Sequence, residues 1–250
     1  MKPILVSGLA RNMLYPISIL WKNMRVSYLA ISEKRCTVQI SGCNFKCRGC
    51  FSNEKGECGM EITGSQLAKY IPADKEIMLA GGEPTLDRQE MLSTISELKN
   101  KPGKRKIIIS TNGSRLDKDL LEELEGITVH IDLKAYGPEL HRWYTGKDNK
   151  NVLSAIRLLY EQDFDFQVST VFIPDIIETP EIGDIARFLS EIGDIRYKIM
   201  RYVPVGDFSR RPYVWEIEDA VNTAHKYLGN VTSSMENRSH PKNRKTIATF

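Results

Sequence analysis

Three cysteines, Cys43, Cys47 and Cys50, lie close together in the stretch GCNFKCRGCF at residues 42–51. Thiolates are soft ligands that suit zinc or iron–sulfur clusters. A structural zinc site is normally closed by four ligands, so a triad indicates a metal group that keeps one position for another ligand. Two alternatives stay open, namely zinc completed by Cys36 or Cys58 and cysteines that only pack.

A second candidate motif is GGEPT at residues 81–85, which follows the apolar run EIMLA. Gly81 and Gly82 allow the backbone to approach a ligand closely, and Pro84 fixes the chain after the carboxylate of Glu83. Backbone carbonyls together with Glu83 would suit an ammonium group. The alternative is an ordinary turn, because glycine pairs are common after strands.

Asp132 and Lys134 form a third candidate pair, because residues two apart on a strand project to the same side. The alternative for this pair is a salt bridge at the end of a strand.

The whole chain alternates short β-rich runs with amphipathic helical stretches, the pattern of a parallel sheet with crossover helices. We therefore predict an α/β fold, either a doubly wound sheet or an incomplete barrel. The predicted strands are 35–41, 76–80, 106–110, 127–133, 165–173 and 195–203. The predicted helices are 63–71, 87–99, 116–125, 149–162 and 180–192, with another at 212–227.

In both arrangements the functional residues lie at the carboxyl ends of the strands. The cysteine triad, GGEPT, TNGS at 111–114 and the Asp132–Lys134 pair all follow predicted strands, so we expect them on one rim. We divide the chain into an N-terminal extension (1–33), the barrel (34–208) and a C-terminal helix and tail (209–250).

Composition narrows the class of protein. With 35 Lys and Arg against 32 Asp and Glu, the net charge of +3 does not indicate a nucleic-acid or membrane partner. No run approaches the roughly 20 apolar residues of a membrane span, and the N-terminus is a poor signal peptide, so we expect a cytoplasmic protein. Five cysteines in such a chain favour metal or redox chemistry over disulfides.

Cys-x3-Cys-x2-Cys after the first predicted strand, with GGEP after the second, resembles the radical S-adenosylmethionine superfamily. This resemblance implies a partial parallel (β/α)6 barrel and a [4Fe–4S] cluster held by Cys43, Cys47 and Cys50, with S-adenosylmethionine on the fourth iron. It also implies that Gly81, Gly82, Glu83 and Pro84 hold the methionine amino group. Asp132 and Lys134, with Thr111 and Asn112 adjacent, would lie near the carboxylate and the ribose.

TNG, IDLK, His141, TG at 145–146 and NVL at 151–153 resemble the activating enzymes of glycyl-radical proteins. This likeness implies an anaerobic oxidoreductase with an electron donor such as flavodoxin or ferredoxin and a glycyl-radical partner protein. The alternatives are a radical enzyme that modifies an anionic small molecule or another protein or RNA target, and a non-catalytic iron–sulfur or zinc module.

Two departures from the family pattern affect the site. Gly49 stands before the third cysteine, where the superfamily usually has an aromatic residue beside adenine, and Phe45 is the candidate replacement. RYVPVG at 201–206 stands where activating enzymes commonly have a histidine. We expect Arg201 to face the mouth of the barrel, where it is available for an anionic substrate, or to form a salt bridge on the rim.

Overall fold

The computed structural model describes residues 24–52, 59–100, 105–236 and 245–249. Its strands are β1 (Met24–Ile31), β2 (Arg35–Ile40), β3 (Met60–Ile62), β4 (Glu76–Gly81), β5 (Ile107–Thr111), β6 (Thr128–Asp132), β7 (Phe166–Phe172), β8 (Tyr197–Arg201), β9 (Val231–Ser233) and β10 (Lys245–Thr249). Its helices are α1 (Gly64–Leu67), the 3-10 turn η2 (Pro84–Leu86), α2 (Arg88–Lys99), α3 (Lys118–Glu123), α4 (Pro138–Thr145), α5 (Lys150–Glu161), α6 (Thr179–Ser190) and α7 (Val214–Ala224).

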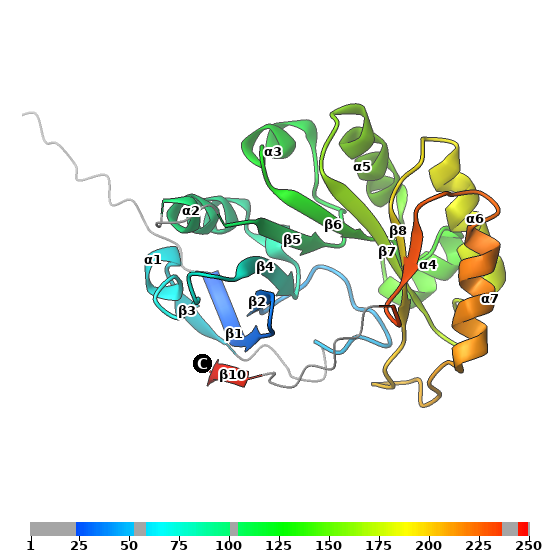
Figure 1. The fold of residues 1–250 in the computed structure, drawn as a ribbon, viewed down its shortest axis with the longest axis horizontal. Coiled ribbons are helices and arrows are strands. Elements are labelled where there is room, and N and C mark those ends of the chain that lie inside the picture. The colour runs from blue at the N-terminus through cyan, green and yellow to red at the C-terminus, as the bar shows by residue number, and fades with distance from the viewer. Residues whose placement is uncertain (1–23, 53–58, 101–104, 237–244, 250) are drawn as a thin grey trace, which may run out of the picture.

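One curved sheet contains all of these strands, in the order β10-β1-β2-β4-β5-β6-β7-β8-β9, with β3 also paired to β1. Neighbours from β2 to β9 are parallel, whereas β1 pairs antiparallel with β2, β3 and β10. The sheet does not close on itself, and α2, α3, α5, α6 and α7 lie along its outer side (Figure 1). The predicted partial parallel α/β barrel is confirmed.

The six predicted strands correspond to β2, β4, β5, β6, β7 and β8. The structure adds β1, β3, β9, β10 and α4, which the sequence analysis did not assign. β1 falls within the segment set apart as an N-terminal extension and is hydrogen-bonded to β2. The division at residues 34 and 208 stays a prediction. Among the described residues, no helix has the length and apolar character needed to cross a bilayer.

The two faces of the sheet differ in chemistry because side chains alternate along each strand. Val38, Leu79, Ile109, Val129 and Ile199 are completely buried. Apolar residues of the outer helices, including Met91, Ile95, Ile156 and Ile185, belong to the same core.

The opposite face carries half-buried residues, many of them polar. Gln39 pairs in register with Ala80 on β4, and Ser110 on β5 pairs with His130, which pairs in turn with Gln167 on β7. The pKa of His130 is lowered to about 4, mainly by burial and also by the charges of Arg35, Lys198 and Arg196, whereas Asp132 opposes the shift. This polar inner face carries the candidate site at its carboxyl edge.

The central strands should dominate stability. Leu79→Ala removes a fully buried side chain and should lower the free energy of unfolding by about 2–5 kcal/mol, measured by urea denaturation. Glu122→Ala, on the exposed side of α3, should change it by less than about 0.5 kcal/mol. Equal losses for the two variants would contradict the assigned core.

Candidate active site

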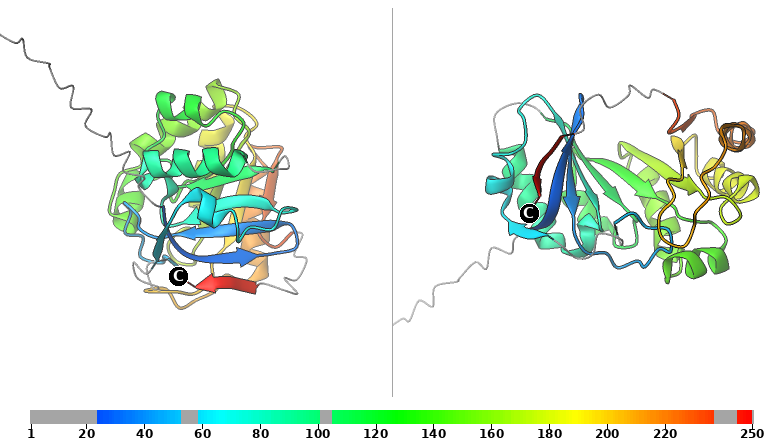
Figure 2. Two further views of the ribbon diagram at one scale, coloured as in Figure 1. Left: turned by 90° about the vertical axis from the view of Figure 1, so that its left-hand side faces the viewer. Right: turned by 90° about the horizontal axis from the view of Figure 1, so that it is seen from below.

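The three predicted cysteine ligands lie on one loop that follows β2. Cys43 is exposed, Cys47 and Cys50 are half-buried, and all three are free thiols. The backbone N–H groups of Lys46 and Arg48 donate to the carbonyls of Thr145 and Tyr144, at 2.8 and 3.0 Å. The loop therefore crosses from β2 to the end of α4, as the view from below also shows (Figure 2).

The HRWYTG stretch shapes that end of α4. Gly146 ends the helix with a left-handed φ of 77°, and its N–H donates to the Arg142 carbonyl at 2.9 Å. The Thr145 hydroxyl donates to the His141 carbonyl at 2.8 Å, and His141 Nδ1 lies 2.8 Å from the Lys147 carbonyl. Buried His141 and Thr145 thus fix the carbonyls that receive the cysteine loop.

The thiols are not arranged around a common point. Burial raises the pKa of Cys47 to about 12, so this thiol holds its proton at neutral pH. Among the described residues, no three His, Cys, Asp or Glu side chains converge as ligands of one metal ion.

Cys36 stands apart from the triad. Cys36 is completely buried in β2, and burial raises its pKa to about 11. It pairs in register with Ile77, at the opposite end of β2 from the triad. Cys58 lies outside the described residues.

Gly81 and Gly82 bring β4 against the start of the cysteine loop. A Cβ atom added at Gly82 would lie 1.9 Å from the Gly42 carbonyl oxygen, and Gly81 has a φ of 114°. The Gly82 N–H donates to the Ile40 carbonyl at 2.7 Å, and the Glu83 N–H donates to the Gly42 carbonyl at 2.8 Å. Only residues without a side chain allow this approach, so the glycines serve packing of the chain on itself.

Glu83 is a buried connector, 1% exposed. Its Oε1 accepts from the Thr85 N–H and hydroxyl at 2.9 and 2.6 Å and from the Thr111 hydroxyl at 2.6 Å. Its Oε2 accepts from the Asn112 N–H at 2.7 Å. Burial raises the pKa of Glu83, and these donors oppose that shift. The carboxylate therefore ties the β4 loop to the β5 loop.

Asn112 extends this connection to the cysteine loop. Its Nδ2 donates to Asn44 Oδ1 at 2.8 Å and lies 3.9 Å from Cys43 Sγ. Asn44 Nδ2 donates to the Ser114 hydroxyl at 2.8 Å, and that hydroxyl donates to Asn112 Oδ1 at 2.7 Å. The sequence analysis gave Asn44 no role and named Ser114 only as the last residue of TNGS, because short polar residues beside a motif carry no signal of their own.

Asp132 and Lys134 form an ion pair of 3.0 Å beside the thiols. The Ser169 hydroxyl donates to Asp132 Oδ1 at 2.5 Å. Burial opposes the charge on Lys134, but nearby Asp132, Cys47 and Tyr144 raise its pKa above the usual range. The predicted strand-end salt bridge is present, and it lies close to the cysteine loop.

The space at Gly49 is filled from the loop after β8. A Cβ atom at Gly49 would lie 2.9 Å from Phe208 Cδ2 and 3.0 Å from the Tyr202 hydroxyl oxygen. Phe45, the expected substitute for an aromatic residue at position 49, is 3% exposed and packs edge-on against His141. The aromatic ring beside Gly49 is therefore that of Phe208.

The predicted orientation of Arg201 toward the mouth is wrong. On β8, Arg201 projects to the same side of the strand as Tyr197 and Ile199, whose side chains are buried in the core. Its Nε donates to the Pro212 carbonyl at 2.8 Å. This side chain is used to hold the segment before α7.

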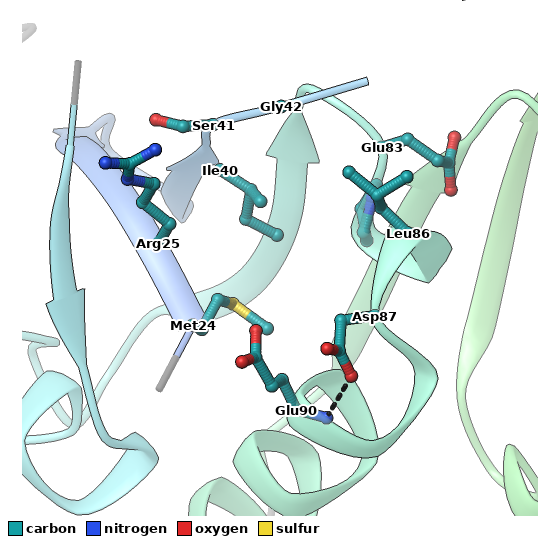
Figure 3. Close-up of a pocket in the computed structure, with 10 residues that line it drawn as sticks. Met24, Arg25, Ile40, Ser41, Gly42, Glu83, Leu86, Asp87 and Glu90 are labelled. Atoms are coloured by element: carbon teal, nitrogen blue, oxygen red, sulfur yellow. Dashed lines mark hydrogen bonds between the residues drawn. The ribbon is translucent and has the colours of Figure 1, made fainter. Parts of the chain in front are cut away.

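A pocket of about 250 Å³ opens beside the GGEPT loop, lined by Met24, Arg25, Leu86, Asp87 and Glu90 among others. Figure 3 shows that the Glu83 carboxylate points away from Met24, Arg25 and Glu90. Because that carboxylate bonds to the β5 loop, the pocket and the site near the cysteines lie on different sides of Glu83.

Comparison with known proteins decides the family. Residues 37–189 match the model of the radical SAM superfamily. The chain belongs to this superfamily. It is an enzyme of the radical S-adenosylmethionine oxidoreductase type, as the resemblance implied.

Two curated relatives are activating enzymes by name. A Methanocaldococcus jannaschii protein, provisionally named a glycyl-radical enzyme activating enzyme, is 37% identical over 90% of this chain and 89% of its own length. The pyruvate formate-lyase-activating enzyme of Streptococcus mutans is 24% identical over 79% of this chain and 86% of its own.

A solved structure shows the same fold. Streptococcus suis SuiB bound to S-adenosylmethionine superposes with a TM-score of 0.62 at 19% identity, over 77% of this chain. This chain spans about half of SuiB, 48% of its length.

Glu83→Ala should destabilise the fold, because it leaves four buried donors without their acceptor. At about 1–3 kcal/mol for each unsatisfied group, the loss should exceed about 3 kcal/mol in urea denaturation. Glu83→Gln keeps the shape and part of the bonding, so its loss should be smaller. An unchanged unfolding midpoint for Glu83→Ala would contradict the connecting role.

Proposed function

We propose that the chain activates a partner protein by forming a glycyl radical on it, using a [4Fe–4S] cluster and S-adenosylmethionine. Cys43, Cys47 and Cys50 would hold the cluster, since they share one loop anchored from outside by α4. Bound there, the cluster would supply the electron for reductive cleavage of S-adenosylmethionine, the chemistry that would lead to hydrogen abstraction from the partner.

The residues around the thiols support binding of S-adenosylmethionine. Glu83 Oε2 accepts a single hydrogen bond from the described residues and therefore keeps a lone pair for the methionine ammonium. Gly81, Gly82 and Pro84 set the position of Glu83, while Thr111 and Asn112 hold its two oxygens. Thr111 and Asn112 thus act by positioning the proposed ligand.

The Lys134–Asp132 pair supplies opposite charges beside the proposed cluster. Lys134 would face the carboxylate of the cofactor, and Asp132 would accept from a ribose hydroxyl. Because Asp132 is fixed by both Lys134 and Ser169, little rearrangement is needed when the cofactor binds.

The proposal of a glycyl-radical protein as substrate rests on the relative that is 37% identical over 90% of this chain. In the sequence, Arg201 is the main argument for an anionic small substrate. Because Arg201 donates to the Pro212 carbonyl, the structure does not support that argument. We further propose a reducing, anaerobic cytoplasm as the setting, because a low-potential donor must supply the electron.

The position of Lys198 supports a second candidate function, that of a radical enzyme acting on an anionic small molecule. This half-buried lysine lies on the inner face of β8, in register with Ser169, and has no ion pair among the described residues. Two GTP 3′,8-cyclases of Vibrio cholerae and Cronobacter sakazakii are 28% and 26% identical over about half of this chain, 56% and 54%.

Anaerobic reconstitution should load about four iron atoms per chain, as a single [4Fe–4S] cluster requires. Cys43→Ala, Cys47→Ala and Cys50→Ala should each abolish the cluster absorbance, measured together with iron content. Cys36→Ala is the matched control and should retain the iron, because Cys36 is buried away from the loop. Retention of a full cluster by any of the three loop variants would contradict the ligand set.

The substrate assignment is tested by mixing the reduced enzyme and S-adenosylmethionine with a candidate glycyl-radical protein from the same cell. Electron paramagnetic resonance should show a glycyl radical on the partner, with one 5′-deoxyadenosine formed per radical. 5′-Deoxyadenosine formed with small-molecule extract but without any partner radical would favour the second candidate. Absence of 5′-deoxyadenosine under all conditions would contradict both.

A further inference from the structure

Three polar side chains form one row across the inner face of the sheet. Ser110 on β5 pairs in register with His130 on β6, and His130 pairs with Gln167 on β7. All three are half-buried, and none of their polar atoms is sealed from solvent. Their side chains form no hydrogen bond with any residue that the structure describes, so the row offers donors and acceptors to a molecule inside the sheet.

Lys198 adds a positive charge to the same face. It lies on β8, in register with Ser169 on β7, and is half-buried. The pKa of His130 is lowered mainly by burial and also by the charge of Lys198, so the two side chains face one space.

The other basic side chains of this face and of the amino ends of its strands already have acidic partners. Their ion pairs are Arg35 with Glu76, Lys134 with Asp132, and both Lys106 and Arg196 with Asp165. Lys198, by contrast, forms no ion pair with any described residue. A half-buried ammonium group without a counter-ion is best satisfied by an anion that binds beside it.

We propose that Lys198 binds a carboxylate of the substrate, while Ser110, His130 and Gln167 form hydrogen bonds with the polar groups next to that carboxylate. This inference deepens the proposed function and rests on it, since it takes the inner face as the substrate side. One lysine without a counter-ion balances a single negative charge. A carboxylate carries that charge, whereas a phosphate monoester carries up to two at neutral pH.

The position of Lys198 suits this task. Asp132 pairs in register with Ser169, and Ser169 pairs with Lys198. At about 4.8 Å between neighbouring strands, the backbones of Asp132 and Lys198 lie roughly 10 Å apart. Because Asp132 is the proposed contact of the cofactor ribose, an anion on Lys198 would hold a compact substrate between the two. The carboxylate has two possible sources, an acidic side chain near the glycine of a partner protein or a small free acid.

The test measures binding to the reconstituted holoenzyme with S-adenosylmethionine, by equilibrium dialysis and mass spectrometry. The probes are seven-residue peptides with a central glycine and blocked ends, each made with one glutamate and with glutamine in its place, together with glutarate and glutaramide. The wild type should retain at least one acid about tenfold better than its amide, which corresponds to about 1.4 kcal/mol. Retention of a peptide identifies the protein source, and retention of glutarate identifies the small acid.

Two neutral variants, Lys198→Gln and Lys198→Met, should lose this preference for the acid, and Lys198→Arg should keep most of it. Gln167→Ala should weaken binding of acid and amide alike, because it removes a hydrogen bond and no charge. The matched control is Lys226→Gln, which removes the same charge at an exposed position beyond α7 and should bind like the wild type. Iron content, measured for every variant, distinguishes a lost contact from a misfolded chain.

Equal retention of every acid and its amide by the wild type would overturn the proposal. A preference that survives in both neutral variants, or that is lost equally in Lys226→Gln, would also overturn it. Failure of the proposed function would look different. An enzyme that distinguishes acid from amide through Lys198 but forms no radical on the candidate partner would refute the partner assignment and support the carboxylate site.

Discussion

Burial of the Glu83 carboxylate is the constraint on which the candidate site depends. A buried carboxylate needs several donors to offset its desolvation, and the available donors lie on the loops after β4 and β5. The hydrogen bonds to Glu83 therefore fix the positions of Thr111 and Asn112. Asn112 in turn fixes the position of Asn44, beside Cys43, by a further hydrogen bond. One hydrogen-bond requirement thus aligns three loops that are distant in sequence.

The cysteine loop is held from two sides, which explains how an irregular segment can present three thiols. On one side it meets the glycine pair of β4, where Gly82 touches the Gly42 carbonyl. On the other side its N–H groups bond to carbonyls at the end of α4. The cap formed by His141, Thr145 and Gly146 thus has a structural purpose, since it positions the acceptors for a loop almost a hundred residues earlier.

Because side chains alternate along each strand, one face of the sheet forms the core and the other carries the candidate site. Residues of one parity form the dry core against the helices, and residues of the other parity form the polar inner face. Arg201 and Lys198 are both basic and lie on the same strand, but their opposite parity sends Arg201 to the segment before α7 and leaves Lys198 on the inner face. Charge alone did not distinguish them.

The sequence by itself determined the parallel strands, the crossover helices and the rim on which the motifs meet, because periodicity and chain order are local properties. The spacing of the cysteines and GGEP also indicated the superfamily. Tertiary structure alone decided that Glu83 bonds to Thr111 and Asn112, that Phe208 fills the space at Gly49, and that Arg201 turns outward. Each of these depends on atoms brought together from distant positions, and a single sequence does not encode such contacts in any local pattern. The short helix α4 was missed for a related reason, since its eight residues gain their role only through the loop that packs against their carbonyls.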